Sequence, residues 1–75
     1  MEVFSKHARE RMRARSISEH QVILTLALPD RRFRGSRGNM IAENAFGSVT
    51  RRVVYEDRRN ASQRPYAFII TAMWK

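Results

Sequence analysis

The sequence predicts an α+β fold in which two N-terminal helices pack on a four-stranded antiparallel sheet. Three observations support this prediction: a capped run of helix-forming residues near the start, a second capped run rich in apolar residues, and strand-like apolar stretches near the end. Helices followed by a run of strands are typical of α+β proteins. The 75 residues are expected to form a single domain, 1–75.

The first helix is expected over residues 6–15. Ser5 is a suitable N-cap because its hydroxyl can accept a hydrogen bond from an unpaired backbone N–H of the first turn. The segment that follows contains no Gly, Pro or β-branched residue and is rich in strong helix formers. Ala8 and Met12 are four residues apart, so they share the face that is expected to pack inward.

A second helix is expected over residues 19–28. Ser18 followed by Gln21 fits a capping box, in which each side chain bonds the other residue's backbone N–H. Pro29 then favours an end to the helix. Apolar residues are spread around this segment, so it is expected to pack on more than one side.

Four strands are expected after the helices, with residues 1–4 as an extended lead-in to the chain. The strand segments are 31–35, 40–46, 48–57 and 66–74. Gly38, within the turn sequence SRGN, can take a positive φ. The last strand, which reads YAFIITAMW, is apolar on both faces, which is typical of a central strand covered on both sides.

Arginine dominates the charge of the chain. Fifteen Lys and Arg residues against seven Asp and Glu give a formal net charge of +8, and Lys6 and Lys75 are the only lysines. The planar guanidinium suits bidentate contacts to phosphate and stacking on bases. The composition therefore indicates a nucleic acid or an acidic protein as the partner, with a basic surface that merely keeps the protein soluble as the simpler alternative.

The composition argues against several other classes of protein. Without cysteine, neither a disulfide framework nor a Cys-based metal site is possible, and no apolar run approaches the ~20 residues of a membrane span. The acids and the two histidines show no metal-ligand spacing, and GSRG at 35–38 lacks the lysine of a phosphate-binding loop. We expect no metal, no cofactor, no membrane contact and, without a signal peptide, a cytoplasmic location.

The candidate site is the face of the first helix that carries His7, Arg11 and Arg15 at i, i+4 and i+8, with Lys6 beside His7. RNA can be cut by its own 2′-hydroxyl, given a group that moves protons and cations that hold the phosphate. Histidine moves protons near neutral pH, and arginines stabilise the developing charge. These residues predict metal-independent RNA cleavage with His7 as acid/base, although a surface histidine and solvated arginines are the alternative.

Later strands add further candidates. Arg51 and Arg52 are expected to bind RNA, unless they only face solvent. Tyr55 and Thr71 are candidate catalytic hydroxyls. Thr71 interrupts an apolar run, and a buried hydroxyl there needs a partner, whereas Tyr55 could instead fill the core or a sheet edge.

The N-terminal segment carries a distinctive pattern, made of Phe4-Ser5-Lys6-His7-Ala8, Arg11-Met12, Arg15, Ile17-Ser18 and Val22. This pattern resembles the N-terminus of a family of small bacterial proteins classed as a domain of unknown function. The family motif reads roughly F-S-x-H-A-x-x-R-M-x-x-R-x-I-S, and the glycine that usually follows its third basic residue is Ser16 here. The segments VVYED and FIITAMW also resemble the last two strands of that family, whereas residues 30–46 match poorly.

That family is similar to the RelE/BrnT-like toxins of the barnase-EndoU-colicin-RelE ribonuclease fold. The resemblance implies a RelE-like fold and an endoribonuclease toxin of the mRNA interferase type, from a type II toxin-antitoxin system. It also implies a cognate antitoxin, expected to be acidic, through which the protein could oligomerise. His7 and Arg11 match the motif and Thr71 matches a late-strand threonine, while Lys6, Arg52 and Tyr55 are weaker matches.

Two other functions fit the same residues. A non-catalytic nucleic-acid-binding module needs the basic face but no proton-transfer group. A basic protein-interaction domain needs only an acidic partner. Salt-dependent binding of RNA without cleavage would indicate the first, and a failure to bind nucleic acid at low salt would indicate the second.

Overall fold

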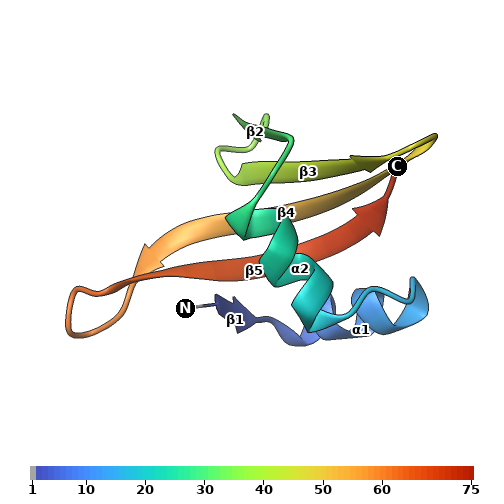
Figure 1. The fold of residues 1–75 in the computed structure, drawn as a ribbon. Coiled ribbons are helices and arrows are strands. Elements are labelled where there is room, and N and C mark those ends of the chain that lie inside the picture. The colour runs from blue at the N-terminus through green and yellow to red at the C-terminus, as the bar shows by residue number, and fades with distance from the viewer. Residues whose placement is uncertain (1) are drawn as a thin grey trace.

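The structure, a computed structural model, describes residues 2–75. The strands form one sheet in the order β1-β5-β4-β3-β2 (Figure 1). Neighbouring strands are antiparallel, except that β1 runs parallel to β5. In chain order the elements are β1 (Glu2–Phe4), α1 (Lys6–Ala14), α2 (Glu19–Ala27), β2 (Arg31–Arg34), β3 (Met40–Phe46), β4 (Val49–Arg59) and β5 (Pro65–Trp74).

The predicted RelE-like fold, with two helices packed on a four-stranded antiparallel sheet, was wrong. The sheet is mixed and has five strands, because the expected lead-in forms β1 and pairs with residues 67–69 of β5. The helices are also placed differently: α1 continues from β1 along β5, whereas α2 lies over β3 and β4 (Figure 1). A strand of three residues is too short to show a period, and its partner lies at the other end of the chain.

Both helices begin where their sequence signals predict. The Ser5 hydroxyl accepts a hydrogen bond from the Ala8 N–H at 3.0 Å, which satisfies one of the free donors of the first turn. At the start of α2, the Ser18 hydroxyl accepts from the Gln21 N–H and the Gln21 side chain accepts from the Ser18 N–H. The predicted capping box is therefore confirmed.

Helix α1 ends in a turn that favours glycine. Ser16 has a φ of 57°. The Ile17 N–H donates to the Met12 carbonyl at 2.8 Å, and the Ser16 N–H donates to the Arg13 carbonyl at 3.3 Å. This is a Schellman motif, completed by apolar contact between its two ends, since Ile17 and Met12 are both in the buried core. Glycine adopts this left-handed conformation more easily than serine because it has no Cβ.

We expect Ser16→Gly to raise the free energy of unfolding by about 0.5–1 kcal/mol. The reason is that the left-handed conformation crowds a Cβ and costs about 1–2 kcal/mol, which the extra freedom of glycine in the unfolded chain partly offsets. Urea denaturation followed by circular dichroism measures the change. Ser36→Gly, in a turn without a positive φ at that residue, should destabilise slightly, and a lower midpoint for Ser16→Gly would contradict the argument.

The core lies between the helices and one face of the sheet. Helix α2 contributes only Val22 and Thr25 as fully buried residues, and its Ile23, Leu24 and Leu28 side chains are exposed. The prediction that this helix packs on more than one side was therefore wrong. The buried apolar residues of the described chain are Ala8, Met12, Ile17, Val22, Ala42, Val53, Tyr55, Ile69 and Ala72.

The opposite face of the sheet carries no helix from residues 2–75 (Figure 1). The prediction that β5 is covered on both sides was therefore wrong, and its Phe68 and Met73 side chains remain partly exposed. Alternation along the strands separates the two faces, so neighbouring residues point to opposite sides. Charged and apolar side chains share this open face.

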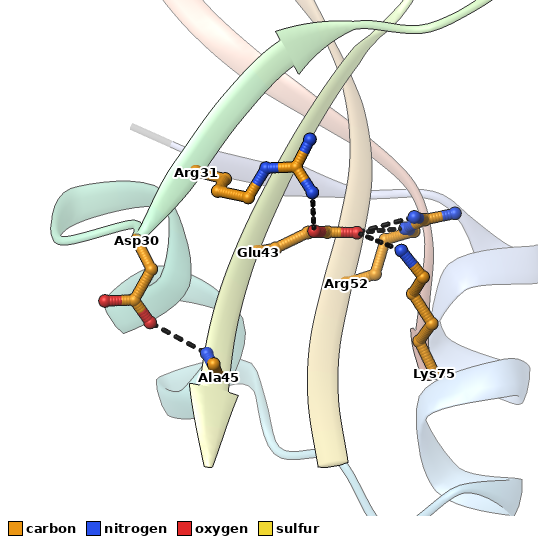
Figure 2. A network of polar contacts seen from close by, with 6 residues as sticks. All are labelled: Asp30, Arg31, Glu43, Ala45, Arg52 and Lys75. Carbon is orange, nitrogen blue, oxygen red and sulfur yellow. Dashed lines mark hydrogen bonds and ion pairs between the residues drawn. The ribbon is translucent and has the colours of Figure 1, made fainter. Parts of the chain in front are cut away.

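Glu43 lies on the open face and is only 3% exposed because cations surround it. Its carboxylate accepts hydrogen bonds from Arg52 at 2.6 Å, and the Arg31 and Lys75 nitrogens lie 3.6 Å from it (Figure 2). Burial by itself would raise the pKa of Glu43. The Arg52 hydrogen bond and the three positive charges together hold that pKa below its ordinary value of 4.5.

The depressed pKa gives the stability of the fold a pH dependence. The ion pairs of Glu43 stabilise the folded state fully when the pH is above 4.5, the ordinary pKa of this carboxyl group. This contribution is lost as the pH falls through the lower pKa that Glu43 has in the folded state. We expect Glu43→Gln to lower the free energy of unfolding by about 1–2 kcal/mol at pH 7, because Arg31 and Lys75 remain largely hydrated. The difference in the free energy of unfolding between Glu43→Gln and wild type should be smaller near pH 3.

Thermal melts at both pH values measure this effect. Glu10→Gln is the matched control, because Glu10 is an exposed carboxylate of α1 and forms no ion pair within residues 2–75. It should change the free energy of unfolding by less than about 0.5 kcal/mol. An equal loss of stability in Glu43→Gln at pH 3 and pH 7 would contradict the assigned ionisation.

Candidate functional site

Helix α1 lies beside the part of β5 that β1 leaves uncovered. The β1–β5 pairing extends only to Ile69, where the Ser5 N–H donates to the Ile69 carbonyl at 3.3 Å. Beyond that point the Arg15 guanidinium, at the end of α1, donates to the Ala72 carbonyl at 2.8 Å. Arg15 therefore occupies part of a strand edge that would otherwise be free.

A bulge in β5 determines where Thr71 points. Val54 lies opposite Thr71 and Tyr55 lies opposite Ile69, so Ile70 is an extra residue in β5. The bulge interrupts the alternation of side chains. Thr71 therefore shares a face with Val54, away from the core that contains Ile69. Its hydroxyl nevertheless lies at the strand edge, 3.5 Å from the Arg15 guanidinium.

His7, Arg11 and Arg15 lie at successive turns and form a line of basic side chains along α1, which we call the α1 ridge. Lys6 directly precedes His7, so its side chain points to a different side of the helix. Lys6, His7 and Arg11 are exposed, whereas Arg15 is partly buried against β5. Within residues 2–75, His7 and Arg11 make no hydrogen bond or ion pair through their side chains. An imidazole and a guanidinium one helical turn apart are thus available to an external ligand.

On the opposite flank of α1, Arg9 is already engaged with the protein. Arg9 forms an ion pair with Glu19 at the start of α2, and its guanidinium lies 5.4 Å from the centre of the Phe4 ring. Arg9 and Arg13 also line a shallow hollow between the two helices. Arg13 likewise makes no hydrogen bond or ion pair through its side chain within residues 2–75. The ridge therefore differs from this flank in carrying an exposed imidazole beside its arginines.

The described residues show neither a metal centre nor a candidate membrane helix. Among residues 2–75, no three His, Asp or Glu side chains gather in a way that could hold a metal ion. No helix in this range is long and apolar enough to cross a bilayer.

Comparison with known proteins places the ridge within a family. A family model described as Domain of unknown function (DUF4258) matches residues 4–74. The chain belongs to the DUF4258 family. No curated protein and no solved structure matches the chain. The match includes both α1 and β5, so the α1 ridge and Thr71 are parts of the DUF4258 domain itself.

The remaining candidates of the DUF4258 domain lie away from the ridge. Tyr55 is 4% exposed within the core, and burial raises the pKa of its phenol. Arg52 lies on the open face, held by Glu43. Arg51 points to the helix-covered face, where it donates to the Thr25 hydroxyl at 2.8 Å. The structure therefore aligns His7, Arg11 and Arg15 along one side of α1 and brings Arg15 to Thr71, whereas Tyr55, Arg51 and Arg52 make their contacts elsewhere.

Sequence reasoning missed the surroundings of Arg51 in this DUF4258 protein. The Arg51 guanidinium lies 4.8 Å from the centre of the Phe46 ring and 5.9 Å from that of Trp74. Strand register is the signal that could have found part of this cluster. In the β3–β4 hairpin, Phe46 pairs with Val49, so Arg51, two residues further along β4, lies on the same face as Phe46.

Proposed function

We propose that this DUF4258 protein is a metal-independent endoribonuclease and a toxin, with chemistry akin to that of the RelE/BrnT-like toxins that its N-terminal motif resembles. The observation that carries the proposal is the α1 ridge. There, an exposed and unpaired His7 lies in line with Arg11 and Arg15, and Arg15 is fixed beside Thr71. The net charge of +8 supports an anionic ligand.

The reaction is transesterification within the RNA strand. The 2′-oxygen loses its proton to the His7 imidazole and forms a bond to the adjacent phosphorus, as the bond from phosphorus to the 5′-oxygen breaks. That oxygen takes up a proton from the imidazolium or from water, leaving a 2′,3′-cyclic phosphate and a 5′-hydroxyl. Arg11 and Arg15 donate hydrogen bonds to the non-bridging oxygens and stabilise their charge. Thr71 acts as a positioning residue for Arg15.

The test is incubation of the purified protein with end-labelled single-stranded RNA, with and without EDTA. We expect cleavage under both conditions and fragments that end in 2′,3′-cyclic phosphate. RNA that stays intact over long incubation would contradict the proposal, as would cleavage that EDTA abolishes. Fragments that end in a 3′-hydroxyl would show a different reaction.

One observation favours RNA binding without cleavage as a second candidate. No side chain of residues 2–75 holds the His7 ring through a hydrogen bond, whereas a partner of that kind commonly orients a histidine and sets its tautomer. Under this alternative, the protein binds RNA with a steep salt dependence but leaves it intact. Cleavage that persists in EDTA would exclude it.

An acidic antitoxin is the protein partner that this proposal includes. The basic surface favours an acidic chain, and the exposed Ile23, Leu24 and Leu28 of α2 offer apolar contacts. Co-expression with an acidic neighbouring gene product should suppress growth arrest, and the two proteins should elute together on gel filtration. Growth arrest that such a product does not relieve would count against that partner.

A further inference from the structure

Arg51 is an almost buried cation without a counter-ion. It is 6% exposed, and within residues 2–75 its side chain has one hydrogen bond, from Nε to Thr25, and no ion pair. Burial lowers the pKa of its guanidinium, although arginine stays protonated in proteins. Because an unpaired buried charge is costly, an anionic ligand at this position would stabilise the fold.

The two terminal nitrogens of Arg51 are not completely sealed from solvent. Among the described side chains, every fully buried nitrogen or oxygen atom has a hydrogen-bond partner. Nη1 and Nη2 of Arg51 have none, so they must retain some contact with the outside. An anion that reaches them can accept charge-assisted hydrogen bonds from both.

Two exposed aromatic rings flank this guanidinium. The rings of Phe46 and Trp74 lie over Arg51, at 4.8 Å and 5.9 Å from its central carbon. They still remain 49% and 40% exposed. Aromatic surface beside a cation is the arrangement on which unpaired nucleobases stack, and it accepts any base because every base has a π-face.

Trp74 connects this cluster to the α1 ridge. Its indole N–H donates to the Arg15 carbonyl at 2.8 Å, and the Arg15 guanidinium in turn binds the Ala72 carbonyl of the same strand. Arg15 therefore contacts β5 twice, through its backbone carbonyl at Trp74 and through its guanidinium at Ala72. The ridge and the two rings are therefore connected through the last residues of β5.

We propose that Arg51, Phe46 and Trp74 form a subsite for one unpaired nucleotide of single-stranded RNA. The phosphate accepts hydrogen bonds from the Arg51 terminal nitrogens, and the base stacks on the exposed ring surface. The inference rests on the proposed function for the identity of the ligand, and it adds that the RNA is single-stranded at this point. Bases within a duplex have their faces covered by their neighbours and cannot stack here.

Trp74 is the only tryptophan of the chain, so its fluorescence reports on the subsite directly. The probe is a fully 2′-O-methylated RNA of mixed sequence and about 12 nucleotides, a length within the usual range of single-strand sites. This RNA has no free 2′-hydroxyl and cannot be cleaved by transesterification. We expect it to quench Trp74, whereas duplex RNA of the same length and polyphosphate should bind with little quenching.

Variants then separate stacking from charge. Phe46→Leu keeps the apolar bulk but removes the ring, and should weaken binding of the methylated RNA by roughly 10-fold. Val49→Ala is the matched control, because Val49 is an exposed apolar residue paired with Phe46 in the same hairpin, and it should bind as wild type. Arg51→Gln should weaken binding at low salt by a similar factor.

Unchanged affinity in Phe46→Leu, in a protein with a wild-type circular dichroism spectrum, would overturn the subsite, and is the result expected if the rings serve a protein interface. The half-exposed ring makes this variant decisive even if Arg51→Gln fails to fold. Quenching without RNA cleavage would contradict the ribonuclease but support the subsite. Cleavage of unmodified RNA without quenching by the methylated probe would overturn the subsite alone.

Discussion

Replacing His7 by alanine is expected to abolish RNA cleavage while leaving the fold intact. His7 is exposed, and its side chain makes no hydrogen bond within residues 2–75, so its loss should cost little stability. A positioned general acid/base contributes about 10²–10⁴ to a rate. Single-turnover cleavage of labelled RNA should therefore slow by that factor, and expression of the variant should no longer arrest growth.

His20→Ala provides the matched control for this experiment. His20 is also an exposed histidine near a helix start, but it belongs to α2 and is not part of the ridge. We expect His20→Ala to cleave RNA within about two-fold of wild type, as is usual for a surface change away from a site. A well-folded His7→Ala variant with full activity would remove the proposed acid/base from the mechanism.

The helices of this domain could be predicted because their signals are local. The Ser5 cap and the Ser18–Gln21 capping box act within one turn, so nearby residues determine where α1 and α2 begin. Strand β1 had no such signal. Residues 2–4 are held by pairing with β5, and only the tertiary structure brings those two segments together.

In the candidate site too, the local spacing could be predicted from the sequence, whereas the tertiary contacts could not. The spacing of His7, Arg11 and Arg15 follows from helix geometry, whereas the contact between Arg15 and Thr71 depends on a bulge at Ile70 that the sequence does not reveal. Alternation alone could have shown that Arg51 and Arg52 point to opposite faces. Burial of Tyr55 beneath the helices could not be inferred before the helices were placed.

Arg11 offers the cleanest test of the phosphate clamp. Arg15 has two roles, since it would bind phosphate and also holds the Ala72 carbonyl, so its replacement would disturb the edge of β5. Arg11 is exposed and its side chain has no partner within the described chain. Loss of activity in an Arg11 variant therefore reports on the ligand and not on the fold.

We expect Arg11→Gln to lower the rate of RNA cleavage by about 100-fold, since one preorganised donor to developing charge is worth about 10²–10³ in rate. Arg13→Gln removes the same charge from the same helix but on the flank beside α2, so it should weaken RNA attraction without changing the cleavage rate of bound RNA. Single-turnover rates at saturating protein separate the two effects. Equal losses in both variants would show that Arg11 contributes net charge alone, and the ridge would then be a binding surface without a phosphate clamp.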